Sequence, residues 1–170
     1  MPPWISIALQ ILGVVGVVGS LVLIWCQTRV DHKQRRREST MSFIAAMSEY
    51  RSIDHELYPT ASDSETGMSP QMIDQLLADL IDSAKAAELV AQLENFAAGV
   101  NQGVFDIDVV NAAKGGYLLS FYERWRPYMQ ARIRTSSYPN RLFDQIEKLV
   151  ADIAKKRGKP IQAPLDRRQG

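Results

Sequence analysis

Residues 4–26 read WISIALQILGVVGVVGSLVLIWC, a run that contains no charged side chain. An α-helix rises about 1.5 Å per residue, so roughly 20 apolar residues suffice to cross a hydrocarbon core about 30 Å thick. Trp4 and Trp25 stand at the two ends of the run, where amphipathic indole rings favour the level of the lipid headgroups. The run therefore predicts a transmembrane anchor over residues 1–27.

A basic cluster follows this run directly and predicts its orientation. Lys and Arg are retained on the cytoplasmic side of a membrane, so the N-terminus is expected outside and the rest of the chain in the cytoplasm. The chain would then be a single-pass protein of the inner (cytoplasmic) membrane. A cleaved signal peptide is disfavoured because no basic residue precedes the run. The residues expected to set topology and contact headgroups are Arg29, Lys33, Arg35, Arg36 and Arg37.

Small residues recur along one side of the predicted anchor. On a helix they form a shallow groove that would let a second helix approach closely, with an amide able to hydrogen-bond across the contact. The alternative is that glycine is simply common in transmembrane helices and marks no interface. The residues of this candidate packing face are Gln10, Gly13, Gly16, Gly19 and Ser20.

The remaining part of the chain is long enough for one domain, and its apolar residues repeat at helical spacing. We expect an all-α fold in which the anchor is followed by a small cytoplasmic bundle of about four to five helices. The expected segments are a basic juxtamembrane stretch with the first cytoplasmic helix (28–58), a loop (59–69), the helical bundle (70–157) and a disordered tail (158–170).

Local signals mark where several of these helices begin. Ser69 followed by Pro70 is typical of a helix start, and Asp106 stands at another. Gly115-Gly116 and Pro127 lie inside the helix that follows Asp106, so a bend or break is expected at one of them. The apolar residues Met72, Ile73, Leu76, Leu77, Leu80 and Ile81 are spaced as one buried stripe of a single helix.

Charge is divided unevenly between two parts of the chain. Residues 54–108 contain eleven acidic residues and one lysine, whereas residues 114–170 contain thirteen basic and five acidic residues. Acidic and basic helices that are neighbours inside one bundle would explain this division. Head-to-tail association between chains, steered by the opposite fields, is the alternative.

The chain shows no pattern that indicates catalysis. Asp54, His55 and Glu56 are adjacent, but neighbouring residues of a helix point in different directions, and His32 is the only other histidine. No phosphate-binding glycine loop, nucleophile elbow or zinc-binding motif is present. We therefore expect no enzyme, no metal and no cofactor. Nucleic acid is not an expected partner, because the basic cluster lacks interleaved aromatic residues.

Three segments resemble a known family: LENFAAGV (93–100), GVFD (103–106) and FYERWRPY (121–128). They are similar to those of a bacterial family of uncharacterised membrane-anchored helical proteins, domain of unknown function four-seven-six-zero. The resemblance extends over about residues 40–156. It implies a bacterial or phage source and the plan of one anchor joined to one helical domain, and it implies no activity or catalytic residues.

Two classes of function follow from these patterns. The first is a protein-interaction module that binds a partner protein or self-associates and that the anchor holds at the membrane. The alternative is a membrane-perturbing antiviral (phage-defence) or toxin-like effector. The candidate interaction residues are Glu123, Arg124 and Arg126, which flank the possible break at Pro127. The aromatic residues of the same segments are expected in the core: Phe96, Phe121, Tyr122, Trp125 and Tyr128.

Overall fold

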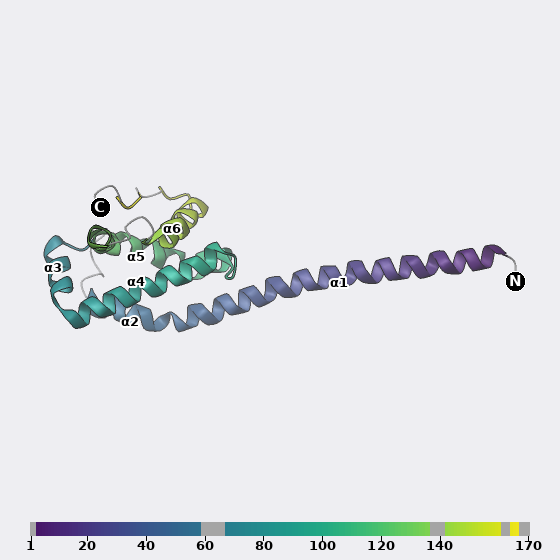
Figure 1. Ribbon diagram of the computed structural model, residues 1–170, viewed down its shortest axis with the longest axis horizontal. Coiled ribbons are helices and arrows are strands. Elements are labelled where there is room, and N and C mark those ends of the chain that lie inside the picture. Colours follow the sequence, from purple (N-terminus) through teal and green to yellow (C-terminus); the bar gives the residue numbers. More distant parts are fainter. Residues whose placement is uncertain (1–2, 59–66, 137–141, 161–163, 167–170) are drawn as a thin grey trace. The chain divides into compact units, whose positions relative to one another are not determined.

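The computed structural model describes residues 3–58, 67–136, 142–160 and 164–166, with side chains at all of these except 3–18, 48 and 49. All regular secondary structure among the described residues is α-helical, and these residues include no strand (Figure 1). The all-α prediction is therefore confirmed. The helices are α1 (Pro3–Ala46), α2 (Ser48–Leu57), α3 (Pro70–Ala78), α4 (Leu80–Asn101), α5 (Ile107–Thr135) and α6 (Asp144–Lys156).

The predicted transmembrane anchor is contradicted. Within the part of the chain that the structure describes, no helix has an apolar stretch of the length that a membrane span requires. The single-pass topology and the inner-membrane location depended on this anchor and are corrected with it. The membrane-perturbing alternative is not tested by this finding.

The chain divides into two compact units, residues 1–38 and residues 39–170. In the first unit the predicted headgroup residues lie on one continuous helix, α1. The guanidinium of Arg29 lies 3.8 Å from the centre of the Trp25 ring, as in a cation–π contact. Gly19 and Ser20 are exposed, whereas the side chains of Trp4, Gln10, Gly13 and Gly16 lie outside the described residues.

The second unit is built around α4, which packs against α2, α3 and α6, while α5 packs against α3 and α6. The aromatic residues expected in the core are all buried there, which confirms that prediction. Phe121 stacks on Trp125 at 5.4 Å between ring centres, and Trp125 meets Tyr128 edge to face at 5.5 Å. Residues four and three apart on one face of α5 thus form a continuous aromatic core.

Two of the predicted helix starts are confirmed. The Ser69 hydroxyl accepts a hydrogen bond from the Met72 N–H at 3.3 Å, and Pro70 occupies the first position of α3. The Asp106 carboxylate accepts from the Asp108 N–H at 2.9 Å, at the start of α5. Each cap satisfies N–H groups that have no partner inside the helix.

The single helix predicted from Met72 to Ile81 is wrong, because the chain breaks at Asp79. The carboxylate of Asp79 accepts hydrogen bonds from the N–H groups of Ile81 (2.8 Å) and Asp82 (3.0 Å) and so begins a new helix, α4. The break changes the helical phase. Leu80 and Ile81 consequently leave the buried stripe and are 88% and 68% exposed.

The proline inside α5 does not end that helix, which continues from Ile107 to Thr135. Proline has no N–H, so Pro127 cannot bond to the carbonyl of Glu123 one turn earlier. The backbone before α3 packs at this position: the Met68 N–H donates to the Arg124 carbonyl at 3.1 Å. A Cβ on Gly67 would lie 3.0 Å from the Glu123 carbonyl oxygen, which explains why glycine fits there.

A carboxylate from another helix caps α6. Phe143 precedes α6 in the left-handed conformation (φ 64°) and supplies no side-chain cap. Glu94 of α4 accepts instead, from the N–H groups of Gln145 (3.0 Å) and Ile146 (2.9 Å). Burial is the largest influence on this group and raises the pKa of Glu94 above its usual value, although both N–H donors lower it. The contact joins two helices that are distant in sequence.

We expect Glu94→Ala to lower the free energy of unfolding by about 1–2 kcal/mol, because two N–H groups lose their acceptor. Since the folded pKa of Glu94 is raised, protonation of Glu94 favours folding, and this contribution is complete below its usual pKa. The difference from wild type should therefore grow as the pH falls from 7 toward 4. Urea unfolding at several pH values measures it; a difference that shrinks with acid would contradict the raised pKa.

Part of the predicted tail has defined contacts. Leu165 is buried, and its N–H donates to the carboxylate of Glu147. The Asp166 N–H donates to the Gln130 side-chain oxygen at 2.8 Å. The disorder predicted for 158–170 therefore does not hold at 164–166. Residues 161–163 and 167–170, like most of the predicted loop (59–66), lie outside the described residues.

Candidate functional site

A buried carboxylate joins α2 to α5. Asp54 is 4% exposed and accepts hydrogen bonds from Trp125 Nε1 (2.7 Å), Arg124 Nη2 (2.7 Å) and the Tyr117 hydroxyl (3.2 Å). The donors stand at positions i, i+7 and i+8 of α5, so they lie on one face of that helix. We call these four residues the Asp54 cluster. Its carboxylate is both neutralised and hydrogen-bonded, which is the condition for a stable buried charge.

The surroundings of Tyr117 keep its hydroxyl protonated. Burial raises the pKa of Tyr117, and the negative charge of Asp54 and the hydrogen bond to it raise the pKa further. The positive charges of Arg124 and Arg51 act in the opposite direction and are weaker. Tyr117 is therefore a hydrogen-bond donor throughout the physiological pH range and is not a candidate base.

A cavity of about 300 Å³ lies beside the Asp54 cluster. Three cationic side chains line it, Arg51 from α2 and Lys114 and Arg124 from α5. We call it the basic pocket. Its complete lining is Met47, Arg51, Ala113, Lys114, Tyr117, Ser120 and Arg124, which includes no carboxylate.

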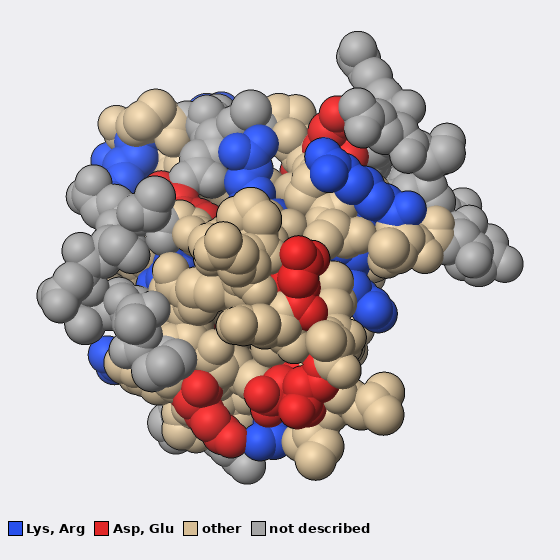
Figure 2. All heavy atoms as spheres, turned by 90° about the vertical axis from the view of Figure 1, so that its left-hand side faces the viewer, with Lys and Arg blue, Asp and Glu red and all other residues tan. Residues whose placement is uncertain are grey.

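A second hollow, of about 330 Å³, lies where α2, the start of α3 and the start of α4 meet. We call it the acidic groove; its lining is Leu57, Met68, Met72, Gln75, Leu76, Asp79 and Asp82. The exposed side chains Leu80 and Ile81 come between its two carboxylates in sequence. Figure 2 faces this end of the domain and shows uncharged side chains at its centre, with several acidic side chains among and below them and basic side chains mainly above and beside them.

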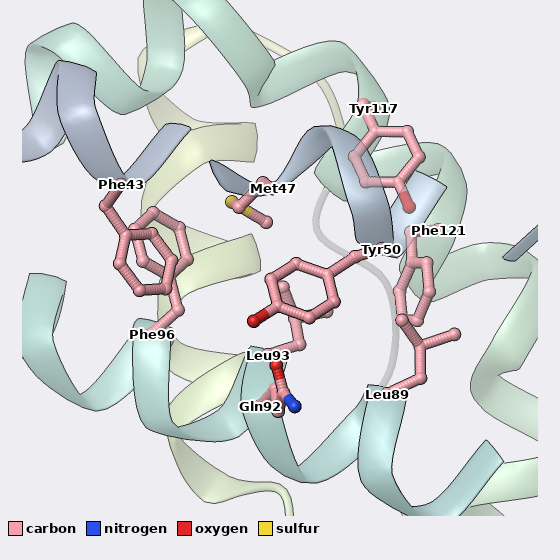
Figure 3. A pocket seen from close by; sticks show the side chains of 9 residues that line it. All are labelled: Phe43, Met47, Tyr50, Leu89, Gln92, Leu93, Phe96, Tyr117 and Phe121. Atoms are coloured by element: carbon pink, nitrogen blue, oxygen red, sulfur yellow. The ribbon is translucent and has the colours of Figure 1, made fainter. Parts of the chain in front are cut away.

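A third cavity is a gap in the core and not a binding site. It measures about 10 Å³, which leaves room for about one water molecule. Phe43 and Phe96 lie face to face at its edge, with ring centres 4.8 Å apart (Figure 3). Its walls are otherwise mostly apolar side chains of α2, α4 and α5. The close packing favours a structural role.

The structure separates the three predicted interaction residues. Arg124 belongs to the Asp54 cluster, with a side chain that is 14% exposed. Arg126 donates to the Pro164 carbonyl at 3.4 Å, and the side chain of Glu123 is exposed. Arg124 thus faces the core, whereas the interaction role expected for Glu123 and Arg126 stays a prediction. The expectation for 54–56 is confirmed: Asp54 is buried, whereas His55 and Glu56 are exposed.

Ion pairs connect the acidic and basic parts of the chain within the domain. Asp54 pairs with Arg124, and Asp108 pairs with Lys156 at 2.7 Å. These contacts agree with the interpretation that oppositely charged helices are neighbours in one bundle. The lining of the acidic groove includes no lysine or arginine, although Lys85, which pairs with Glu56, also interacts electrostatically with Asp79 and Asp82.

Sequence reasoning missed the Asp54 cluster, although a signal for it exists. Phe43, Met47, Tyr50 and Leu57 mark the apolar face of the predicted first helix, and Asp54 falls on that same face by spacing. A lone acidic residue on an apolar face requires a buried partner. No group of histidine, cysteine or carboxylate ligands suited to a metal ion occurs among the residues described.

The sequence pattern of a known family covers most of the chain. The family described as Domain of unknown function (DUF4760) matches residues 11–153, and the chain belongs to this family. No curated protein and no solved structure matches the chain. The family description states no activity, so the roles of individual residues depend on the geometry given above.

Proposed function

We propose that this member of the DUF4760 family is a protein-interaction module that binds a basic amphipathic helix of a partner protein in its acidic groove. The observation that carries the proposal is the pair Leu80 and Ile81, which are exposed at 88% and 68% and stand in sequence between Asp79 and Asp82, two residues that line the groove. Neighbouring large apolar side chains on a surface favour an interaction site.

The lining of the acidic groove fits such a partner. Met72 is half-buried, flexible and polarizable, so it can adapt to apolar side chains of different shape, whereas Met68 is buried and forms the base of the groove. Asp79 and Asp82 place negative charge at the edge, which attracts lysine and arginine and fixes the orientation of a docked helix. An amphipathic helix presents its apolar residues at i, i+3, i+4 and i+7 to a groove of this kind.

The test uses a model peptide of leucine and lysine at helical spacing, and a scrambled peptide of identical composition. We expect the first peptide to bind in fluorescence anisotropy and the double variant Leu80→Ser/Ile81→Ser to bind at least tenfold more weakly. Both side chains are exposed in the free domain, so the variant should keep its thermal midpoint. Val104→Ser, which changes an exposed apolar residue in another part of the domain, is the matched control.

Three outcomes would overturn the proposal: equal binding of the scrambled peptide, unchanged binding by the Leu80→Ser/Ile81→Ser variant, or no binding. Sedimentation velocity of the protein alone adds a separate comparison. If the wild type forms dimers that this double variant abolishes, the groove binds a second copy and the assignment to a partner helix is wrong.

A further inference from the structure

Among the residues that the structure describes, the basic pocket contains more positive charge than neighbouring carboxylates neutralise. Arg51, Lys114 and Arg124 line it, and the nearby carboxylate of Asp54 already accepts hydrogen bonds from three donors. With Asp54 counted, the site keeps an excess of about two positive charges at neutral pH. Such an excess of positive charge within one cavity favours the binding of an anion, and it favours a dianion over a monoanion.

Several side chains of α5 that line the basic pocket carry hydrogen-bond donors and lie on one side of that helix. Lys114, Tyr117 and Arg124 stand at i, i+3 and i+10 of α5 and therefore project to one side of the helix, and Ser120 also lines the cavity. Arg124 uses Nη2 to bond Asp54, and its buried Nε has no hydrogen-bond partner among the described residues. Guanidinium, ammonium and hydroxyl donors together are the groups that bind phosphate oxygens.

The volume of the basic pocket and its uncharged lining residues indicate the size and chemical character of its ligand. At about 300 Å³ the cavity is at the lower end of the range for small-molecule sites, and one phosphate group fills only part of it. Met47, Ala113 and the ring of Tyr117 supply apolar contact for the rest of a ligand. We propose that the basic pocket binds a small phosphate monoester, with Arg51, Lys114 and Arg124 on the phosphate. This site is distinct from the acidic groove and does not depend on it.

Calorimetric titration with glycerol 3-phosphate at pH 7.5 tests the proposal, since a phosphate monoester is largely dianionic there. We expect binding by wild type, at least tenfold weaker binding by Lys114→Met, and loss of detectable binding by Arg51→Met/Lys114→Met. Arg51 is exposed, so Arg51→Met alone is a second probe that leaves the core intact. Lys148→Met, at an exposed lysine on α6 that does not line the pocket, is the matched control and should bind as wild type does.

Several results would overturn the assignment. Absence of binding at millimolar concentration, or wild-type affinity in both Arg51→Met and Lys114→Met, would exclude the pocket. An equal loss in Lys148→Met would show non-specific attraction to positive charge. Glycerol serves as the uncharged comparison, and inorganic phosphate bound as tightly as the ester would overturn the assignment to an ester. Equal thermal midpoints of all variants would show that any loss of affinity does not result from unfolding.

Discussion

Replacing Asp54 by alanine is expected to lower the free energy of unfolding by about 3–5 kcal/mol, because it leaves the buried Arg124 charge without its partner. The same change removes the acceptor of the Trp125 N–H and the Tyr117 hydroxyl. Chemical denaturation followed by circular dichroism and tryptophan fluorescence measures the loss. A decrease below about 1 kcal/mol would show that water replaces the carboxylate and that the cluster is not essential.

The neighbouring residue Glu56 supplies a matched control for Asp54. Both carboxylates lie in α2 and pair with a cation at nearly the same distance, 2.6 Å for Glu56 with Lys85 and 2.7 Å for Asp54 with Arg124. They differ in burial: the Glu56 side chain is 60% exposed and that of Asp54 only 5%. Glu56→Ala should therefore cost at most about 1 kcal/mol. Similar losses for the two variants would contradict the argument from burial.

Phe96→Ala is expected to cost about 3–5 kcal/mol, since it removes a fully packed ring from the core. Phe96 stacks on Phe43 of α1 at 4.8 Å and contacts Phe105 at 5.4 Å. The substitution thus opens a cavity and breaks the contact that joins residues 39–46 to α4. The midpoint and slope of urea unfolding measure the effect.

Two comparison variants separate ring loss from a general effect of substitution. Phe96→Leu keeps much of the volume and should cost clearly less than alanine. Val104→Ala changes an exposed side chain and should leave the unfolding midpoint nearly unchanged. If Phe96→Ala and Val104→Ala were equally mild, the aromatic stack would not contribute to the stability of the domain.

Short-range features of this chain could be predicted from its sequence. The capping side chains of Ser69 and Asp106 act on N–H groups two or three residues away, so the local pattern contains the whole interaction. Helical spacing likewise predicted the buried aromatic face of α5. The break at Asp79 was missed, although its cap is equally local, because the apolar spacing continued across it.

The candidate sites, in contrast, were decided by the tertiary structure. Asp54 meets its donors 63–71 residues away in sequence, and Glu94 caps a helix that begins about 50 residues later. No local pattern specifies such pairs, because they depend on how α2, α4, α5 and α6 pack.

The apolar run at residues 4–26 predicted a membrane span from composition alone, and the described helices do not bear it out. For this chain the sequence by itself determined the helical class, the caps of α3 and α5 and the core aromatic residues, since periodicity and these two caps act within a few residues. Only the tertiary structure placed three cations around one cavity and brought three donors to Asp54, because both arrangements depend on the packing of separate helices.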